Sequence, residues 1–313
     1  MSDHAAVLPQ VLVPYPGPRG DGSVQDIFVY LRPETNGVLV ESALLKVVQS
    51  CSQYRRGIRL VYMANFPGAY ILDHHIVERH YSHKFYFAVH GKRAFTEKMK
   101  AEFESHYGVP YDRAEIIGSF QALTQFDVSP DELFSRWVPA SDVLRVDGQI
   151  IKCIDGVYVV NYDIPALLHK NTRNTDIAVM MFRCEVDYGY FEDLVAEMRE
   201  VLVQKGLLPA RLPTSRVFHY SRGPFDQILD AVDYLCEPDG SPIGVERLSF
   251  AAYAHAKGYD PSALMSLVEN PICVFESDSG SLEEESIFTY TAMDSYATAL
   301  EKIARVRAQL WIR

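Results

Sequence analysis

The sequence predicts an α/β or α+β protein made of two β-α-β-α units that a β-meander joins. Each half of the chain opens with a strand pattern, continues with a helical pattern and returns to a strand pattern. Between the halves, two Asp-Gly pairs stand among short β-rich runs, which is typical of tight antiparallel turns. We therefore expect four regions: a Pro- and Gly-rich arm (1–23), a first α/β unit (24–137), a β-meander connector (138–170) and a second α/β unit (171–313).

In the first unit, β-branched and aromatic runs predict strands, and apolar residues spaced three and four apart predict helices. Thr96 and Ser129 have the character of helix N-caps, and Gly108 is placed to end a helix. Residues 85–89 fit a strand or a continued helix equally well. The predicted elements are strands at 24–31 and 58–66, and helices at 38–50, 69–81, 96–107, 112–126 and 129–137.

The middle of the chain predicts a three-stranded antiparallel meander over residues 143–161. Asp147-Gly148 and Asp155-Gly156 are each flanked by β-rich sequence. Asp-Gly favours a type I′ turn because both central residues of that turn need a positive φ.

The second unit repeats the alternation of strands and helices. We interpret Glu283-Glu284-Glu285 as a helix N-terminal turn or a solvated loop. The predicted elements are strands at 176–186, 215–220, 272–275 and 287–291, and helices at 190–205, 224–236, 245–257, 260–270 and 294–311.

The two halves also suggest an internal duplication. Asp-Ile-x-Val opens the strand at residue 26 and again at residue 176. A Gly followed by an aromatic residue and Ile-Leu-Asp begins a later helix in each half, at Gly68 and at Gly223. The alternative is that any two β-α-β-α units resemble each other to this degree, so duplication is a hypothesis.

Composition narrows the class of protein. The formal net charge is −11, and residues 151–313 carry 24 acidic against 15 basic side chains. Such a chain repels a phosphate backbone, which disfavours nucleic acid as a partner. Five cysteines without a CxxC pair, and an N-terminus without a secretory pattern, favour a soluble cytoplasmic protein with reduced thiols. No apolar run approaches the ~20 residues that span a membrane.

The densest concentration of chemically active side chains begins at His74. Six of the ten histidines lie between residues 74 and 106. On a continuous helix over 69–81, His74, His75 and Glu78 are spaced three and four apart and share a face. Imidazole with carboxylate suits a divalent metal such as zinc. The alternative is a solvated helix face with hydrogen-bonded histidines.

The same region is locally basic, and it suggests an anion site. Asn65 to Gly68 forms a strand-to-helix turn, and the amides of a helix N-terminus favour anions. Arg79 and Lys84 are the candidate ligand-binding cations, within a run that continues to Lys100. The alternative is an ordinary turn followed by an exposed basic helix.

Two classes of function fit these patterns. The first is a non-enzymatic regulatory, ligand-sensing or scaffold protein whose partner is a protein or a small anionic ligand. The second is an enzyme that acts on a small anionic substrate, with or without a metal, through the His-rich segment 74–90. The chain lacks the GxGxxG, GxxxxGK[ST], HExxH and GxSxG motifs, which favours the first class.

Overall fold

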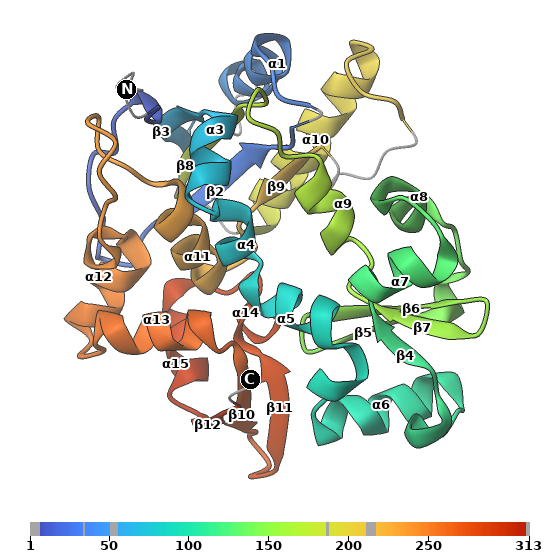
Figure 1. Ribbon diagram of the computed structural model, residues 1–313. Coiled ribbons are helices and arrows are strands. Elements are labelled where there is room, and N and C mark those ends of the chain that lie inside the picture. Colours follow the sequence, from blue (N-terminus) through green and yellow to red (C-terminus); the bar gives the residue numbers. More distant parts are fainter. Residues whose placement is uncertain (1–6, 34, 51–55, 186–187, 211–216, 311–313) are drawn as a thin grey trace, which may run out of the picture. The chain divides into compact units, whose positions relative to one another are not determined.

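The computed structural model describes residues 7–33, 35–50, 56–185, 188–210 and 217–310, and its fold is mixed α/β (Figure 1). The chain divides into two compact units. Unit 1 contains residues 1–76, 171–268 and 291–302, and unit 2 contains residues 77–170, 269–290 and 303–313. Each unit is therefore assembled from segments that lie far apart in the sequence, whereas the predicted boundaries divide the chain consecutively.

Unit 1 is built on a five-stranded antiparallel sheet with the order β1-β3-β8-β2-β9. The predicted strands at the start of each half are present, and residues 10–13 of the predicted arm add an edge strand. The ends of two predicted strands, at residues 186 and 215–216, lie outside the described residues. The strands are β1 (Gln10–Val13), β2 (Gln25–Leu31), β3 (Ile58–Phe66), β8 (Ile177–Cys184) and β9 (Phe218–Tyr220).

Both predicted β-α-β segments contribute to this one sheet. Helix α1 (Val38–Ser50) connects β2 to β3, and helix α10 (Tyr188–Gln204) precedes β9 after β8. In the strand order, β8 separates β2 from β3, and β2 separates β8 from β9, so the two segments interleave as a split β-α-β arrangement. Strands from both halves of the chain therefore share one sheet, and the duplication stays a hypothesis.

Helices cover both faces of the sheet in unit 1. The side chains of Ile27, Val29 and Leu31 on β2 share a core with α1 and α10. The alternate residue Tyr30 faces the other way and packs against Tyr234 with tilted rings, at the end of α11 (Pro224–Tyr234). Burial on both faces explains why these strands read as continuous apolar runs. Helices α12 (Ser249–Ala256), α13 (Pro261–Glu269) and α15 (Tyr296–Ile303) belong mainly to the same unit.

The predicted meander is confirmed in unit 2. Strands β5 (Val143–Val146), β6 (Gln149–Ile154) and β7 (Val157–Val160) pair antiparallel in sequence order. In both turns the Asp and the Gly have positive φ: +46° and +77° at 147–148, +50° and +83° at 155–156. A parallel strand that the sequence did not reveal, β4 (Ile116–Gly118), extends this sheet beside β7.

Several short helices pack around this sheet. Helix α6 (Glu97–Tyr107) begins and ends as predicted, with Thr96 accepting from the Met99 amide and Gly108 at a φ of +66°. Residues 85–89, which fitted a strand or a continued helix equally well, are helical. Further helices of this unit are α5 (Ser82–His90), α7 (Ser119–Phe126), α8 (Pro130–Ser135) and α9 (Ile164–His169). The predicted helix over 112–126 is wrong in its first half, because β4 occupies residues 116–118.

A second, three-stranded sheet completes unit 2, with the order β11-β10-β12. Three predictions are corrected here: the Glu283–Glu285 run is a strand, residues 287–290 form the short helix α14, and the helix predicted to reach residue 311 ends at Ile303. Residue 311 itself lies outside the described residues. The strands are β10 (Ile272–Glu276), β11 (Leu282–Ser286) and β12 (Val306–Gln309).

Candidate functional site

The predicted helix that carries the histidines is broken where they lie. Helix α3 (Gly68–Asp73) ends at His74, and His75 has a φ of +50°, so α4 (Ile76–His80) begins as a separate helix. The argument that His74, His75 and Glu78 share one helical face therefore fails. His74 instead stacks on Tyr70, with the ring centroids 4.0 Å apart, and its Nδ1 lies 3.0 Å from the Tyr70 carbonyl oxygen.

The structure does not gather the three predicted zinc ligands into one group. Among the described residues, none of His74, His75 and Glu78 belongs to a group of three ligating side chains whose ligand atoms lie within 4.8 Å of one another. The zinc site rests on the sequence pattern and stays a prediction.

The predicted anion site at Asn65 and Gly68 is bound to a carboxylate of the chain itself. Asn65 Nδ2 donates to Asp176 Oδ2 over 2.9 Å, and the Gly68 amide donates to Asp176 Oδ1 over 3.2 Å. A Cβ on Gly68 would lie 2.1 Å from the Thr172 carbonyl oxygen, so this turn is tightly packed. The Asp176 carboxylate thus stands where the sequence analysis places an anionic ligand.

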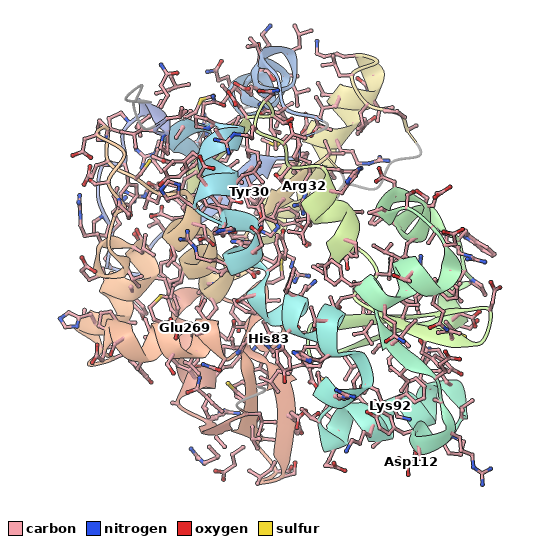
Figure 2. All side chains as sticks on the ribbon, in the orientation of Figure 1. Tyr30, Arg32, His83, Lys92, Asp112 and Glu269 are labelled. Carbon is pink, nitrogen blue, oxygen red and sulfur yellow. The ribbon has the colours of Figure 1, made fainter. Side chains whose placement is uncertain are left out.

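The basic residues after this turn do not lie on one helix. Arg79 is in α4 and Lys84 in α5, and Lys84 offers its carbonyl oxygen to Asn161 Nδ2 at 2.9 Å. Lys92 donates to the carbonyl oxygen of Asp112 over 3.1 Å (both residues are labelled in Figure 2). Its ammonium also lies over the Tyr111 ring, 4.8 Å from the centroid. Their role in binding a ligand stays a prediction.

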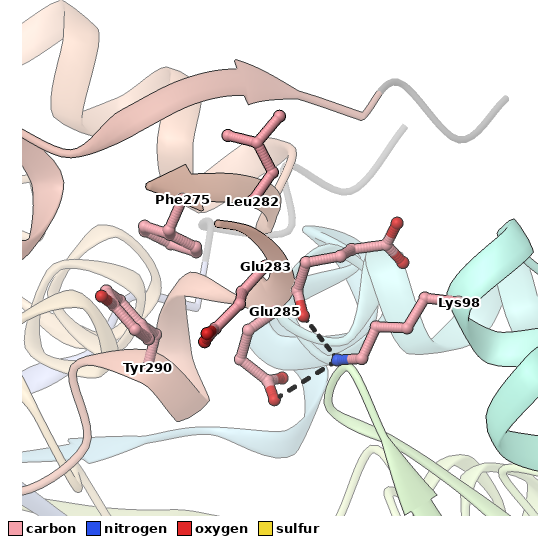
Figure 3. Close-up of a pocket in the computed structure, with 7 residues that line it drawn as sticks. Lys98, Phe275, Leu282, Glu283, Glu285 and Tyr290 are labelled. Carbon is pink, nitrogen blue, oxygen red and sulfur yellow. Dashed lines mark hydrogen bonds and ion pairs between the residues drawn. The ribbon is translucent and has the colours of Figure 1, made fainter. Parts of the chain in front are cut away.

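A pocket in unit 2 brings together side chains that the sequence analysis treated separately. It encloses about 460 Å³ where the start of α6 faces strand β11 (Figure 3). Its wall is aromatic on one side and acidic on the other, and Lys98 lies beyond the labelled glutamates, away from the aromatic pair. The lining residues are Lys98, Phe275, Leu282, Glu283, Glu284, Glu285 and Tyr290.

Three segments position the polar groups of this pocket. Thr96, the N-cap of α6, donates its hydroxyl to Glu284, which ties the first turn of the helix to β11. The turn at Asp147-Gly148 lies close by, because a Cβ on Gly148 would lie 3.4 Å from Ser286 Oγ. Strand pairing places Glu283 opposite Phe275 on β10, so these two side chains lie on the same face of the sheet. The rings of Phe275 and Tyr290 stack with centroids 3.9 Å apart.

The Lys98 ammonium lies among oxygen atoms. Nζ contacts Asp147 Oδ1 at 2.7 Å, Glu102 Oε1 at 3.6 Å and Glu285 Oε2 at 3.7 Å, and it donates to the Glu284 carbonyl oxygen. Burial alone lowers the pKa of Lys98, but Asp147 and the glutamates raise it by more. Lys98 therefore carries its positive charge throughout the neutral range.

Asp147 is the most perturbed carboxylate of this group. Its side chain is fully buried, and its Oδ2 has no hydrogen-bond partner among the described residues. Burial raises the pKa of Asp147 to about 7, although the hydrogen bond and charge of Lys98 lower it. A buried carboxylate with such a pKa beside a cavity is typical of functional sites.

Unit 1 contains a buried polar cluster that is built differently. Ser221 Oγ donates to Asp230 Oδ2 over 2.6 Å and accepts from the Phe28 amide, and His219 Nε2 lies 3.3 Å from Asp230 Oδ1. Serine, histidine and aspartate form the triad of nucleophilic catalysis when the histidine contacts the serine. Here the serine and the histidine both contact the aspartate instead. Ser221 is completely buried, so these contacts hold β2, β9 and α11 together.

Comparison with known proteins offers no second route to a function. Neither the family models, nor the curated proteins, nor the solved structures give a match to this chain. Among the described residues, no helix combines the length and the apolar character that crossing a membrane requires. The site must therefore be interpreted from its own chemistry.

Proposed function

We propose that this protein is a non-enzymatic ligand-sensing protein, and that its ligand is a small organic cation bound in the pocket of unit 2. Three glutamates line the pocket against a single lysine, so the lining side chains carry an excess of negative charge. A cationic ligand is attracted by this wall, and an anionic one is repelled. The proposal keeps the ligand-sensing class expected from the sequence and reverses the expected charge of the ligand.

The aromatic side of the pocket favours an organic cation over a metal ion. Tyr290, which is partly exposed and stacks on the buried Phe275, offers ring surface beside the carboxylates, and a guanidinium or ammonium group gains from both the ring and the carboxylates. Leu282, whose side chain is largely exposed, adds apolar surface for an alkyl chain. The partly exposed Tyr290 ring next to three glutamates is the observation that carries this proposal.

One observation speaks for the alternative of an enzyme. A group with a pKa near 7, such as Asp147, can accept or donate a proton in catalysis. Against this, the Asp147 side chain is fully buried and does not line the pocket. Lys98 stays protonated and is no nucleophile, so the geometry supports binding better than chemistry.

Titration calorimetry with agmatine, which has a guanidinium and an ammonium on a butyl chain, tests this proposal. We expect agmatine to bind at low ionic strength, and phosphate not to bind. The double variant E283Q/E285Q should weaken agmatine binding by about tenfold or more, because it removes two carboxylates from the wall.

The matched control is E97Q on the first turn of α6, where the glutamate side chain is 90% exposed and outside the pocket. E97Q should keep the affinity for agmatine. The proposal is wrong if agmatine fails to bind the wild type, or if E283Q/E285Q binds it as tightly as E97Q does. Tighter binding of calcium than of agmatine would overturn the organic-cation assignment.

A further inference from the structure

The pocket already contains one cationic group, and it belongs to the chain. The Lys98 ammonium lies within 3.7 Å of three carboxylates, and it also reaches the Glu284 carbonyl oxygen. Two of these oxygen groups, on Glu284 and Glu285, line the cavity itself (Figure 3). A ligand cation that seeks the most negative part of the wall meets Lys98 there.

We propose that Lys98 is an internal competitor for the ligand: the ligand's cationic group takes over Glu285 and the Glu284 carbonyl, and the Lys98 ammonium withdraws to Asp147 and Glu102. This inference rests on the proposed function and names the residue that sets its affinity.

The two groups of partners differ in a way that permits this exchange. Asp147 has a fully buried side chain and lies outside the cavity lining, so a ligand in the pocket does not reach it. Glu102 is four residues after Lys98 on α6, on the same face of the helix. Lys98 therefore keeps two carboxylates after it gives up its partners on β11.

The same lysine determines which cations the pocket accepts. A divalent ion needs several oxygen ligands, and the carboxylate and carbonyl oxygens that could serve here surround the Lys98 ammonium. A bound Lys98 ammonium repels a doubly charged ion more than a singly charged group. Removal of the lysine charge should therefore improve the affinity for agmatine and create affinity for calcium.

The test compares K98M with wild type by titration calorimetry, with agmatine and with calcium chloride as separate probes. K98M should bind agmatine about tenfold tighter than wild type at low ionic strength and should gain measurable calcium binding. The matched control is K100M, on the same helix, whose lysine pairs with Glu97 at 2.6 Å outside the pocket. K100M should bind agmatine as the wild type does.

The possible results separate this inference from the proposed function. If wild type binds agmatine and K98M binds it no more tightly, Lys98 is not a competitor, and the proposed function stands. If neither protein binds agmatine, both fail. If K98M does not fold, as judged by circular dichroism, the double variant K98M/D147N replaces it, because this variant removes the buried acid together with its cation. K98M/D147N must also bind agmatine more tightly than wild type.

Discussion

Lys98 Nζ lies 2.7 Å from Oδ1 of Asp147, and this contact joins the first turn of α6 to a turn of the meander. The two groups respond differently to burial. The lysine remains charged because carboxylates surround it, whereas the pKa of Asp147 rises to about 7 because its side chain is removed from water. Near neutral pH, folded molecules therefore hold Asp147 in both protonation states.

The raised pKa of Asp147 predicts a pH-dependent stability. Below the ordinary pKa of aspartate, about 4, both folded and unfolded chains hold this proton. Between that value and about 7 only the folded protein holds it, so the free energy of unfolding falls as the pH rises through this window. D147N removes the titration. We expect the wild-type free energy of unfolding, relative to D147N, to fall by ~1–4 kcal/mol from pH 4 to pH 8 in urea denaturation.

The chain supplies a matched control for this measurement in the other meander turn. Asp155 has a φ of +50°, like Asp147, but its side chain is 71% exposed and pairs with Arg136 at the surface. Asparagine tolerates this backbone in both turns. D155N should differ from wild type by an amount that is nearly constant with pH. Equal pH profiles for D147N and D155N would contradict the raised pKa.

Removal of Lys98 should destabilise the protein mainly at alkaline pH. In K98M, three carboxylates lose their shared cation, and one of them is fully buried. At pH 8 we expect a loss of ~2–4 kcal/mol in the free energy of unfolding, and a smaller loss at pH 5, where Asp147 takes up a proton. The double variant K98M/D147N should recover part of the loss at pH 8. Strict additivity of the two single changes would show that Lys98 and Asp147 are not coupled.

Local chemistry explains which parts of the fold the sequence could predict. Asp-Gly pairs and helix caps act through their own backbone, so the meander turns and the limits of α6 were foreseeable. The helix predicted over residues 294–311 shows the converse. Helical spacing holds up to Ile303, but residues 306–310 alternate apolar and polar side chains, which is the strand pattern of β12.

The pocket was beyond prediction because its parts meet only through tertiary pairing. Lys98 and Glu285 are distant in sequence, and Asp147 reaches them from a third segment. Glutamate is depleted in strands, so three in succession do not suggest β11, which forms by pairing with the apolar strand β10. Lys98 belongs to the basic run that we interpreted as an anion site, but its neighbours in space are acidic.

The ion pair between Asp26 and Arg183 should be a strong determinant of stability in unit 1. The two residues are opposed on β2 and β8, the guanidinium donates to both carboxylate oxygens over 2.7 and 2.8 Å, and both side chains are less than 8% exposed. D26N leaves a buried arginine without its charge partner. We expect a loss of ~3–5 kcal/mol in the free energy of unfolding, measured by urea denaturation.

The pair between Asp73 and Arg173 isolates the effect of burial. It has the same doubly hydrogen-bonded geometry, at 2.6 and 2.9 Å, but both side chains are more than half exposed. D73N should leave the free energy of unfolding nearly unchanged, because solvent screens an exposed pair. A loss in D26N as small as that in D73N would mean that the buried pair contributes little to folding.

Two glycines offer a final comparison, between a close approach and open space. A Cβ on Gly68 would lie 2.1 Å from the Thr172 carbonyl oxygen and 2.7 Å from that of Thr175, so G68A must push this loop away and weaken the contacts of Asp176. We expect G68A to lower the free energy of unfolding by ~2–4 kcal/mol. Gly189 lies in the first turn of α10, and apart from its chain neighbours and its own helix backbone no described residue has an atom within 4 Å of the added Cβ, so G189A should be neutral or stabilising by ~0.5 kcal/mol. Urea denaturation of both variants at pH 7 provides the measurement, and a G68A protein as stable as G189A would show that the loop yields without strain.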